Sequence, residues 1–127
     1  MAASTEERIA ELTRGMLRKK LYVVLTKAAG APDRIRDLLP LHLEYMIGLE
    51  KKGVVFASGP LSEAGGEPRG DGMTILRCAS ADEARRIAEA DPFYVNGLRR
   101  FEVREWTVME GSLTLKVNFS DQSAEVA

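Results

Sequence analysis

The sequence predicts a single α+β domain in which strands and helices follow one another in the order β-α-β-β-α-β. Short runs of apolar and β-branched residues, typical of strands, recur along the chain. Two amphipathic segments with helix-boundary signals separate them. The length of 127 residues suits one domain with its own hydrophobic core.

The composition disfavours several classes of protein. The formal net charge is −1 and the basic residues are scattered, so we expect no nucleic-acid partner. A zinc site of the usual nitrogen and sulfur type is disfavoured because Cys78 is the only cysteine and His42 the only histidine. No apolar run approaches the ~20 residues that span a bilayer. Since residues 1–20 also lack the pattern of a secretion signal, we expect a cytoplasmic protein without a membrane partner.

The N-terminal residues predict a helical extension followed by a central strand. Ser4 and Glu7 have the spacing of a capping box, so residues 4–17 are expected to be helical. This extension is either an appendage or the product of a misassigned start site. The continuous apolar run over residues 21–26 predicts the first strand, at the centre of the sheet.

The helix that follows, ending at Gly53, carries the only histidine. Its apolar stripe consists of Ile35, Leu38, Leu39, Met46 and Leu49. His42 lies near the middle of that stripe, where a buried imidazole needs a hydrogen-bond partner. Pro40 predicts either a helix that begins there, with His42 near its N-terminus, or a kink.

The remaining elements follow from turn and capping signals. A second strand over residues 54–57 leads into a sharp turn at Ser58-Gly59-Pro60-Leu61, and a glycine-rich loop covers residues 62–71. A third strand is expected over residues 72–79. The second helix begins with the capping box at Ser80 and ends at Asp91, which precedes Pro92.

Two strands are expected after the second helix. Apolar and polar residues alternate over residues 99–108, and again over residues 113–120, where the alternation predicts a half-buried fifth strand. The tail from about Asp121 is expected to be frayed. The whole order corresponds to a ferredoxin-like arrangement with both helices on one face of an antiparallel sheet. The opposite face is also apolar, and we expect a homodimer packed sheet against sheet.

Several motifs, taken in order, resemble the YciI-like (YCII-related) family. They are Leu39-Pro40-Leu41-His42-Leu43, Gly53, Ala57-Ser58-Gly59-Pro60-Leu61, Gly72, and Asp91-Pro92-Phe93 with Gly97. The resemblance covers roughly residues 20–110 and implies a dimeric α+β barrel. It leaves an N-terminal extension over residues 1–19 and a strand and tail over residues 111–127. Leu39 departs from the family pattern, which often has a basic residue just before the proline.

The resemblance implies that His42 and Asp91 form a His-Asp dyad. Such a pair would transfer protons, without a cofactor, in an elimination or isomerisation of a small organic substrate of the hydroxylated aromatic type. A carboxylate beside one imidazole nitrogen fixes the tautomer and leaves the other nitrogen free. Candidate substrate-binding residues are Ser58, Gly59, Pro60, Tyr45 and Phe93.

Other interpretations stay open. Asp91 is also a typical helix cap or turn former before a proline, and Ser58 and Tyr45 are common packing residues. The chain is alternatively a non-catalytic small-molecule-binding or accessory dimer, in which His42 and Asp91 only tie two helices together. A third hypothesis is a haem-binding barrel with His42 as the axial ligand. A catalytic pair must line a cleft with room for a ligand, whereas a structural pair would be sealed.

Overall fold

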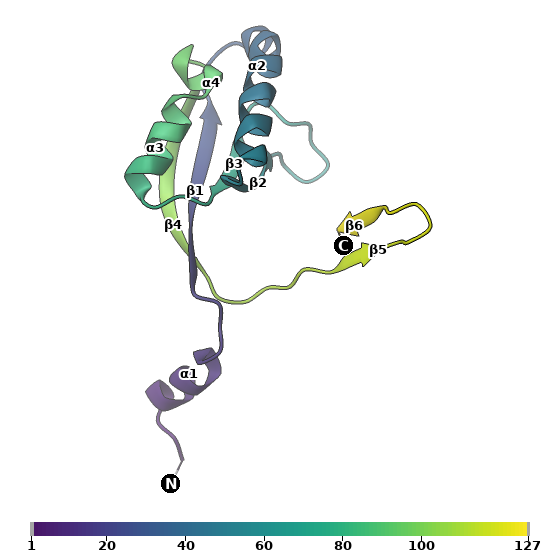
Figure 1. Cartoon of the computed structure of the whole chain (residues 1–127). Helices are drawn as coiled ribbons and strands as arrows, with labels where there is room; N and C mark the ends of the chain where they lie inside the picture. The colour runs from purple at the N-terminus through teal and green to yellow at the C-terminus, as the bar shows by residue number, and fades with distance from the viewer. Residues whose placement is uncertain (1, 127) are drawn as a thin grey trace. The chain divides into compact units, whose positions relative to one another are not determined.

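The computed structural model describes residues 2–126, and its contacts divide the chain into two units. Residues 20–107 form the larger unit, shown with its sheet and helices in Figure 1. The smaller unit combines the N-terminal residues up to Lys19 with those from Val108 onward. The elements in chain order are α1 Thr5–Thr13, β1 Lys19–Ala28, α2 Pro32–Lys51, β2 Val55–Pro60, β3 Gly72–Leu76, α3 Ala81–Glu89, α4 Pro92–Val95, β4 Arg99–Val108, β5 Leu115–Val117 and β6 Ala124–Val126.

The larger unit is built on a four-stranded sheet in the order β2-β3-β1-β4. Strand β3 pairs antiparallel with both β1 and β2, and its Leu76 lies opposite Tyr22 of β1. With α2 between β1 and β2 and α3 between β3 and β4, this is a ferredoxin-like arrangement. The predicted α+β fold is therefore confirmed.

One face of the sheet carries the core. Tyr22, Val24 and Leu76 pack there against Ala84 of α3, with Phe101 of β4 beside them. Residues from α2 and α4 meet the same face, because Tyr45 and Tyr94 border a small internal cavity together with Val24. The helices therefore share one side of the sheet, and their apolar stripes and the inward side chains of the strands exclude water together.

The opposite face of the sheet is not covered by a helix of the larger unit. Side chains alternate along a strand, so Leu25, Met73 and Ile75 point away from the helices. Met73 remains partly exposed, as does Phe56 on the neighbouring strand. An apolar sheet face of this kind is typical of an interaction surface.

Capping residues, a glycine and strand alternation in the sequence correctly predicted where several helices and strands begin or end. Ser4 and Ser80 cap α1 and α3, each accepting a hydrogen bond from the backbone three residues later, as their capping boxes predict. Gly53 follows α2 with a φ of +78°, a backbone conformation that glycine adopts without strain. Strand β4 covers the predicted residues. Helix α1, in contrast, ends at Thr13 rather than at residue 17.

The helix carrying His42 does not begin near Pro40. It begins at Pro32, which occupies the first turn that proline favours, and it continues through Pro40 to Lys51. Of the two alternatives at Pro40, the helix that begins there with His42 near its N-terminus was therefore wrong. The physical reason is that packing of a long apolar stripe can outweigh the hydrogen bond that an internal proline removes.

The C-terminal segment differs from the prediction. Strand β5 is short and pairs with β6 in a separate two-stranded sheet. The expected half-buried face is absent from this described segment, since Phe119 is 92% exposed and Leu115 is exposed as well. The tail, expected to be frayed, contains β6. Alternation identifies which side chains share a face, but not whether anything covers that face.

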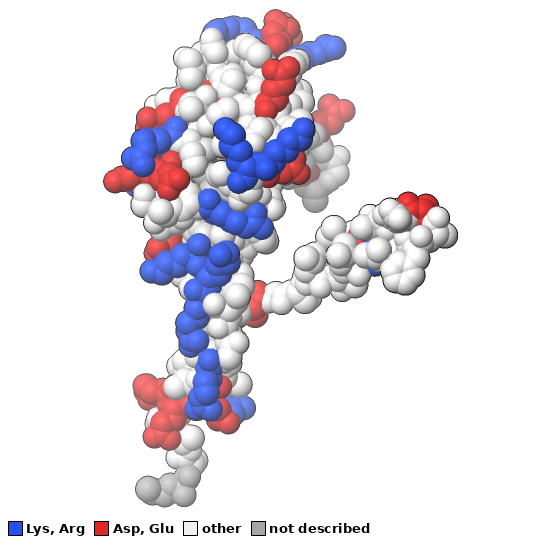
Figure 2. Space-filling model, in the orientation of Figure 1, with Lys and Arg blue, Asp and Glu red and all other residues white. Residues whose placement is uncertain are grey.

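Charged side chains of both signs lie on the larger unit, including the region around its helices (Figure 2).

No helix in residues 2–126 combines the length and the apolar character that crossing a bilayer requires.

Truncating Leu76 tests the position of the core. Leu76 is 1% exposed, so Leu76→Ala should lower the free energy of unfolding by about 2 to 5 kcal/mol through lost apolar contact and a new cavity. Urea unfolding followed by circular dichroism measures the change. The matched control is Leu43→Ala on the exposed side of α2, for which a loss of less than about 1 kcal/mol is expected. Equal losses for both variants would contradict this core.

Candidate functional site

Helix α2 and the junction between α3 and α4 bring His42 and Asp91 together. The distance from His42 Nδ1 to Asp91 Oδ2 is 2.8 Å. Only 13% of the His42 side chain and 9% of the Asp91 side chain are exposed. His42 lies in the interior of α2, so the first residues of the helix do not set its environment. The buried imidazole has the polar partner that its position in the apolar stripe requires.

Asp91 also caps a helix that the sequence did not predict. The short helix α4 begins at Pro92, and Asp91 Oδ1 accepts a hydrogen bond of 2.9 Å from the backbone N–H of Phe93. One carboxylate oxygen therefore holds the chain turn, while the other contacts the imidazole. The cap and the pairing with His42, which were alternatives from sequence alone, are present in the same side chain.

Phe93 and Arg99 complete the surroundings of this pair. Phe93 is buried, and its ring stacks on the His42 imidazole with centroids 4.5 Å apart. The Arg99 guanidinium lies 4.7 Å from the centre of the same phenyl ring. Its Nη1 atom is 3.7 Å from Asp91 Oδ2. Sequence reasoning missed Arg99, because nothing in the strand pattern distinguishes it from the neighbouring Arg100.

The other predicted ligand-binding residues are engaged in protein contacts. The Tyr45 hydroxyl donates a 2.7 Å hydrogen bond to the carbonyl oxygen of Ile87, and burial raises the pKa of Tyr45, with the Asp91 carboxylate adding to the effect. Ser58 Oγ lies 2.7 Å from Thr74 Oγ1 on the adjacent strand. These contacts hold α2 to α3 and β2 to β3.

Gly59 and Pro60 do not form the sharp turn expected after the second strand. They continue β2, where Gly59 lies opposite Met73 and Pro60 opposite Gly72. Pro60 fits at this position because β2 is an edge strand, where a missing N–H costs no sheet hydrogen bond.

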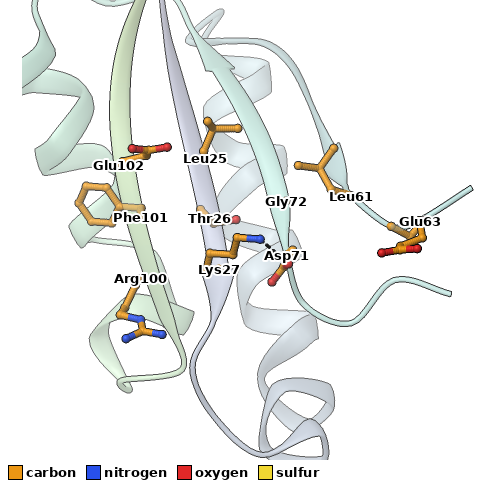
Figure 3. Close-up of a pocket in the computed structure, with 11 residues that line it drawn as sticks. Leu25, Thr26, Lys27, Leu61, Glu63, Asp71, Gly72, Arg100, Phe101 and Glu102 are labelled. Atoms are coloured by element: carbon orange, nitrogen blue, oxygen red, sulfur yellow. Dashed lines mark hydrogen bonds and ion pairs between the residues drawn. The ribbon is translucent and has the colours of Figure 1, made fainter. Parts of the chain in front are cut away.

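A large pocket is lined by residues that do not include His42. Its volume is about 670 Å³, and it is bordered by β1, β4 and the residues flanking the glycine-rich loop, among them Leu25, Thr26, Leu61 and Phe101 (Figure 3). Asp91 lines a different cavity of about 20 Å³ between the helices and the sheet. In the described residues of this single chain, His42 borders neither cavity.

An ion pair anchors one end of the loop that borders the large pocket. Lys27 Nζ lies 3.2 Å from Asp71 Oδ2 (Figure 3). Asp71 Oδ1 also accepts a hydrogen bond from the Ala28 backbone N–H. The bond from Ala28, helped by Lys27, lowers the pKa of Asp71. Across residues 2–126, no three histidine, cysteine, aspartate or glutamate side chains cluster as metal ligands would.

Comparisons with known proteins extend these observations. A search of curated proteins found no match. Among solved structures, the chain is similar to 5-chloro-2-hydroxyhydroquinone dehydrochlorinase (TftG) from Burkholderia phenoliruptrix AC1100, solved in complex with 2,5-dihydroxybenzoquinone. The TM-score is 0.60 and the sequence identity 27%, over 68% of this chain and 93% of that chain.

The family comparison agrees with the fold and with the resemblance carried by the sequence motifs. The model of the YCII-related domain matches residues 20–107, which is more than half of the chain and coincides with the larger unit. The chain therefore belongs to the family of proteins with a YCII-related domain.

Proposed function

We propose that this protein is a cofactor-independent acid/base enzyme that catalyses an elimination or isomerisation of a small hydroxylated aromatic or quinone-type compound. His42 transfers the proton, and Asp91 orients the imidazole. The observation that carries this proposal is the 2.8 Å contact between His42 Nδ1 and Asp91 Oδ2 in largely buried surroundings. The similarity to a dehydrochlorinase, whose structure was solved in complex with 2,5-dihydroxybenzoquinone, supports the substrate class.

The geometry of the pair suits a general base. A carboxylate that accepts a hydrogen bond from Nδ1 selects the neutral tautomer in which Nε2 carries a lone pair. Nε2 then removes a proton from the substrate, and the electron pair of that bond forms a new double bond while a leaving group departs with its own pair. In an isomerisation, the imidazolium returns the proton to another carbon or oxygen. Phe93 restricts the plane of the imidazole by stacking on it.

A second copy of the chain is part of this proposal. The uncovered sheet face exposes apolar side chains, including Met73 of β3. Leu25, opposite Met73 on β1, lines the large pocket. Packing two such faces together would remove apolar surface from water and enclose the pocket.

A non-catalytic role is the second candidate function. His42 and Asp91 are mostly buried, and neither borders the large pocket. In a binding or accessory module, the pair would only fasten α2 to the α3–α4 junction. Turnover and binding measurements on the same compounds separate the two functions.

Replacing the carboxylate by an amide tests the electrostatic pairing. Asp91→Asn keeps a good helix cap but removes the negative charge, so the titration midpoint of His42 should fall by about 1 to 3 units. NMR of the imidazole measures it, and the signal is unambiguous because the chain has one histidine.

Asp71→Asn is the matched control, since this carboxylate contacts Lys27 and Ala28 rather than His42. It should leave the midpoint unchanged. If the midpoint is also unchanged in a folded Asp91→Asn variant, the two side chains are not electrostatically coupled, and the structural role becomes the better explanation.

Turnover by the wild type is expected with hydroxyhydroquinones or hydroxybenzoquinones, chlorinated or not. Chloride release and ultraviolet absorbance report elimination, and exchange of carbon-bound hydrogen in deuterium oxide reports isomerisation. His42→Gln should lower kcat/KM by roughly 100-fold or more, as expected for a lost general base. Glu44→Gln, on the exposed side of α2, should have little effect. Binding of these compounds without any turnover would favour the non-catalytic module.

The oligomeric state is tested by placing a charge on the uncovered sheet face. The wild type should sediment as a dimer, and Met73→Glu should sediment as a monomer because a buried carboxylate without a partner is strongly disfavoured. Leu43→Glu, on the exposed side of α2, should remain dimeric. A wild-type monomer at micromolar concentration, or dissociation caused only by Leu43→Glu, would contradict packing through the sheet.

A further inference from the structure

Arg99 is a charged side chain at the His42–Asp91 pair to which the proposed function gives no role. We propose that Arg99 is a positioning residue that offsets part of the charge of Asp91 and thereby lowers the proton affinity of His42. The proposal rests on the proposed function, because a general base works best when its proton affinity matches the working pH. A residue of β4 thereby influences the proton affinity of His42, which lies on α2.

The first support is the shared carboxylate oxygen. Asp91 Oδ2 lies 2.8 Å from His42 Nδ1 and 3.7 Å from Arg99 Nη1. The longer distance exceeds that of a hydrogen bond, so the guanidinium acts on this oxygen mainly through its charge. One carboxylate oxygen therefore lies near both the Arg99 guanidinium and the His42 imidazole. Protonation of His42 places a second positive charge beside the same carboxylate.

The second support is the way the guanidinium is held. Arg99 Nη2 donates a 3.0 Å hydrogen bond to the carbonyl oxygen of Gly70, and the guanidinium lies over the Phe93 ring. Phe93 in turn stacks on His42. A planar guanidinium fixed by a carbonyl and a ring loses little further freedom when it faces a carboxylate.

The third support is burial. The Arg99 side chain is 11% exposed, so water screens its charge poorly. Burial lowers the pKa of the guanidinium, while the carboxylates of Asp91 and Asp71 act in the opposite direction. An arginine remains a cation under such conditions, because its ordinary pKa lies far above neutrality.

The other ionisable groups near this cluster do not duplicate the effect. The Tyr45 hydroxyl of α2 donates a hydrogen bond to the Ile87 carbonyl oxygen, and burial raises the pKa of Tyr45, so this side chain is neutral at physiological pH. Asp71, at the start of β3, is paired with Lys27 of β1. Among the contacts of the described residues, Arg99 is thus the cation that faces the Asp91 carboxylate together with His42.

The test is a titration of the His42 imidazole by NMR in the full chain without substrate. Arg99→Met should raise the midpoint by about half a unit or more, because the carboxylate then acts on the imidazolium alone. Arg99→Gln keeps a donor for the Gly70 carbonyl and should give a similar rise. Arg99→Lys retains the charge and should restore most of the wild-type value. Arg100→Met, at an exposed neighbour on β4, should leave the His42 midpoint unchanged.

A midpoint that is unchanged or lower in both folded variants without the charge would overturn the proposal, as would an equal rise in Arg99→Lys. Arg99→Gln keeps the test decisive if Arg99→Met fails to fold. For an active enzyme, the acidic limb of the kcat/KM profile should move upward with the midpoint. Absence of turnover would reject the proposed function but not the electrostatic role of Arg99, whereas turnover with an unchanged midpoint would reject only the latter.

Discussion

The Asp91 carboxylate joins the parts of the larger unit that surround the candidate site. One oxygen caps α4 and fixes the turn out of α3, and the other lies between the imidazole of α2 and the guanidinium of β4. A carboxylate with such low exposure is tolerated because each oxygen has a polar partner. Helix packing and site chemistry therefore depend on the same side chain, and substitutions at this position must be chosen to separate them. An asparagine does so, since it preserves the cap and removes the charge.

The two faces of the sheet have different roles. The helical face holds the apolar core and the buried pair, and its small cavity leaves no room for a ligand of aromatic size. The opposite face is apolar but uncovered by helices, and the large pocket opens beside it. The proposed dimer relates these features, because a partner sheet would complete the walls of the pocket. Catalysis by the pair would then require a ligand that reaches Nε2 of His42 from the assembled dimer.

Much of the fold could be predicted because its signals are local. The capping serines, the glycine after α2 and the alternation along β4 depend on neighbouring residues and on backbone geometry. The errors occurred where distant contacts decide. No helix began at Pro40, the alternating C-terminal segment did not acquire a buried face, and the Ser58-Gly59-Pro60 turn became part of β2. For Pro40 and for the expected turn, tertiary packing outweighed a local preference. For the C-terminal segment, no packing partner covered the face that the alternation predicted.

The sequence by itself determined the β-α-β-β-α-β order of the main strands and helices, and it identified His42 as a polar residue in an apolar stripe that needs a partner. Its motifs, through their family resemblance, also identified Asp91 as that partner. Only the tertiary structure decided that both oxygens of Asp91 are used, that Arg99 shares one of them, and that His42 does not line the large pocket. These features join residues from different helices and strands. Helical and strand periodicities set which side chains share a face, whereas the packing of those faces sets which charges meet.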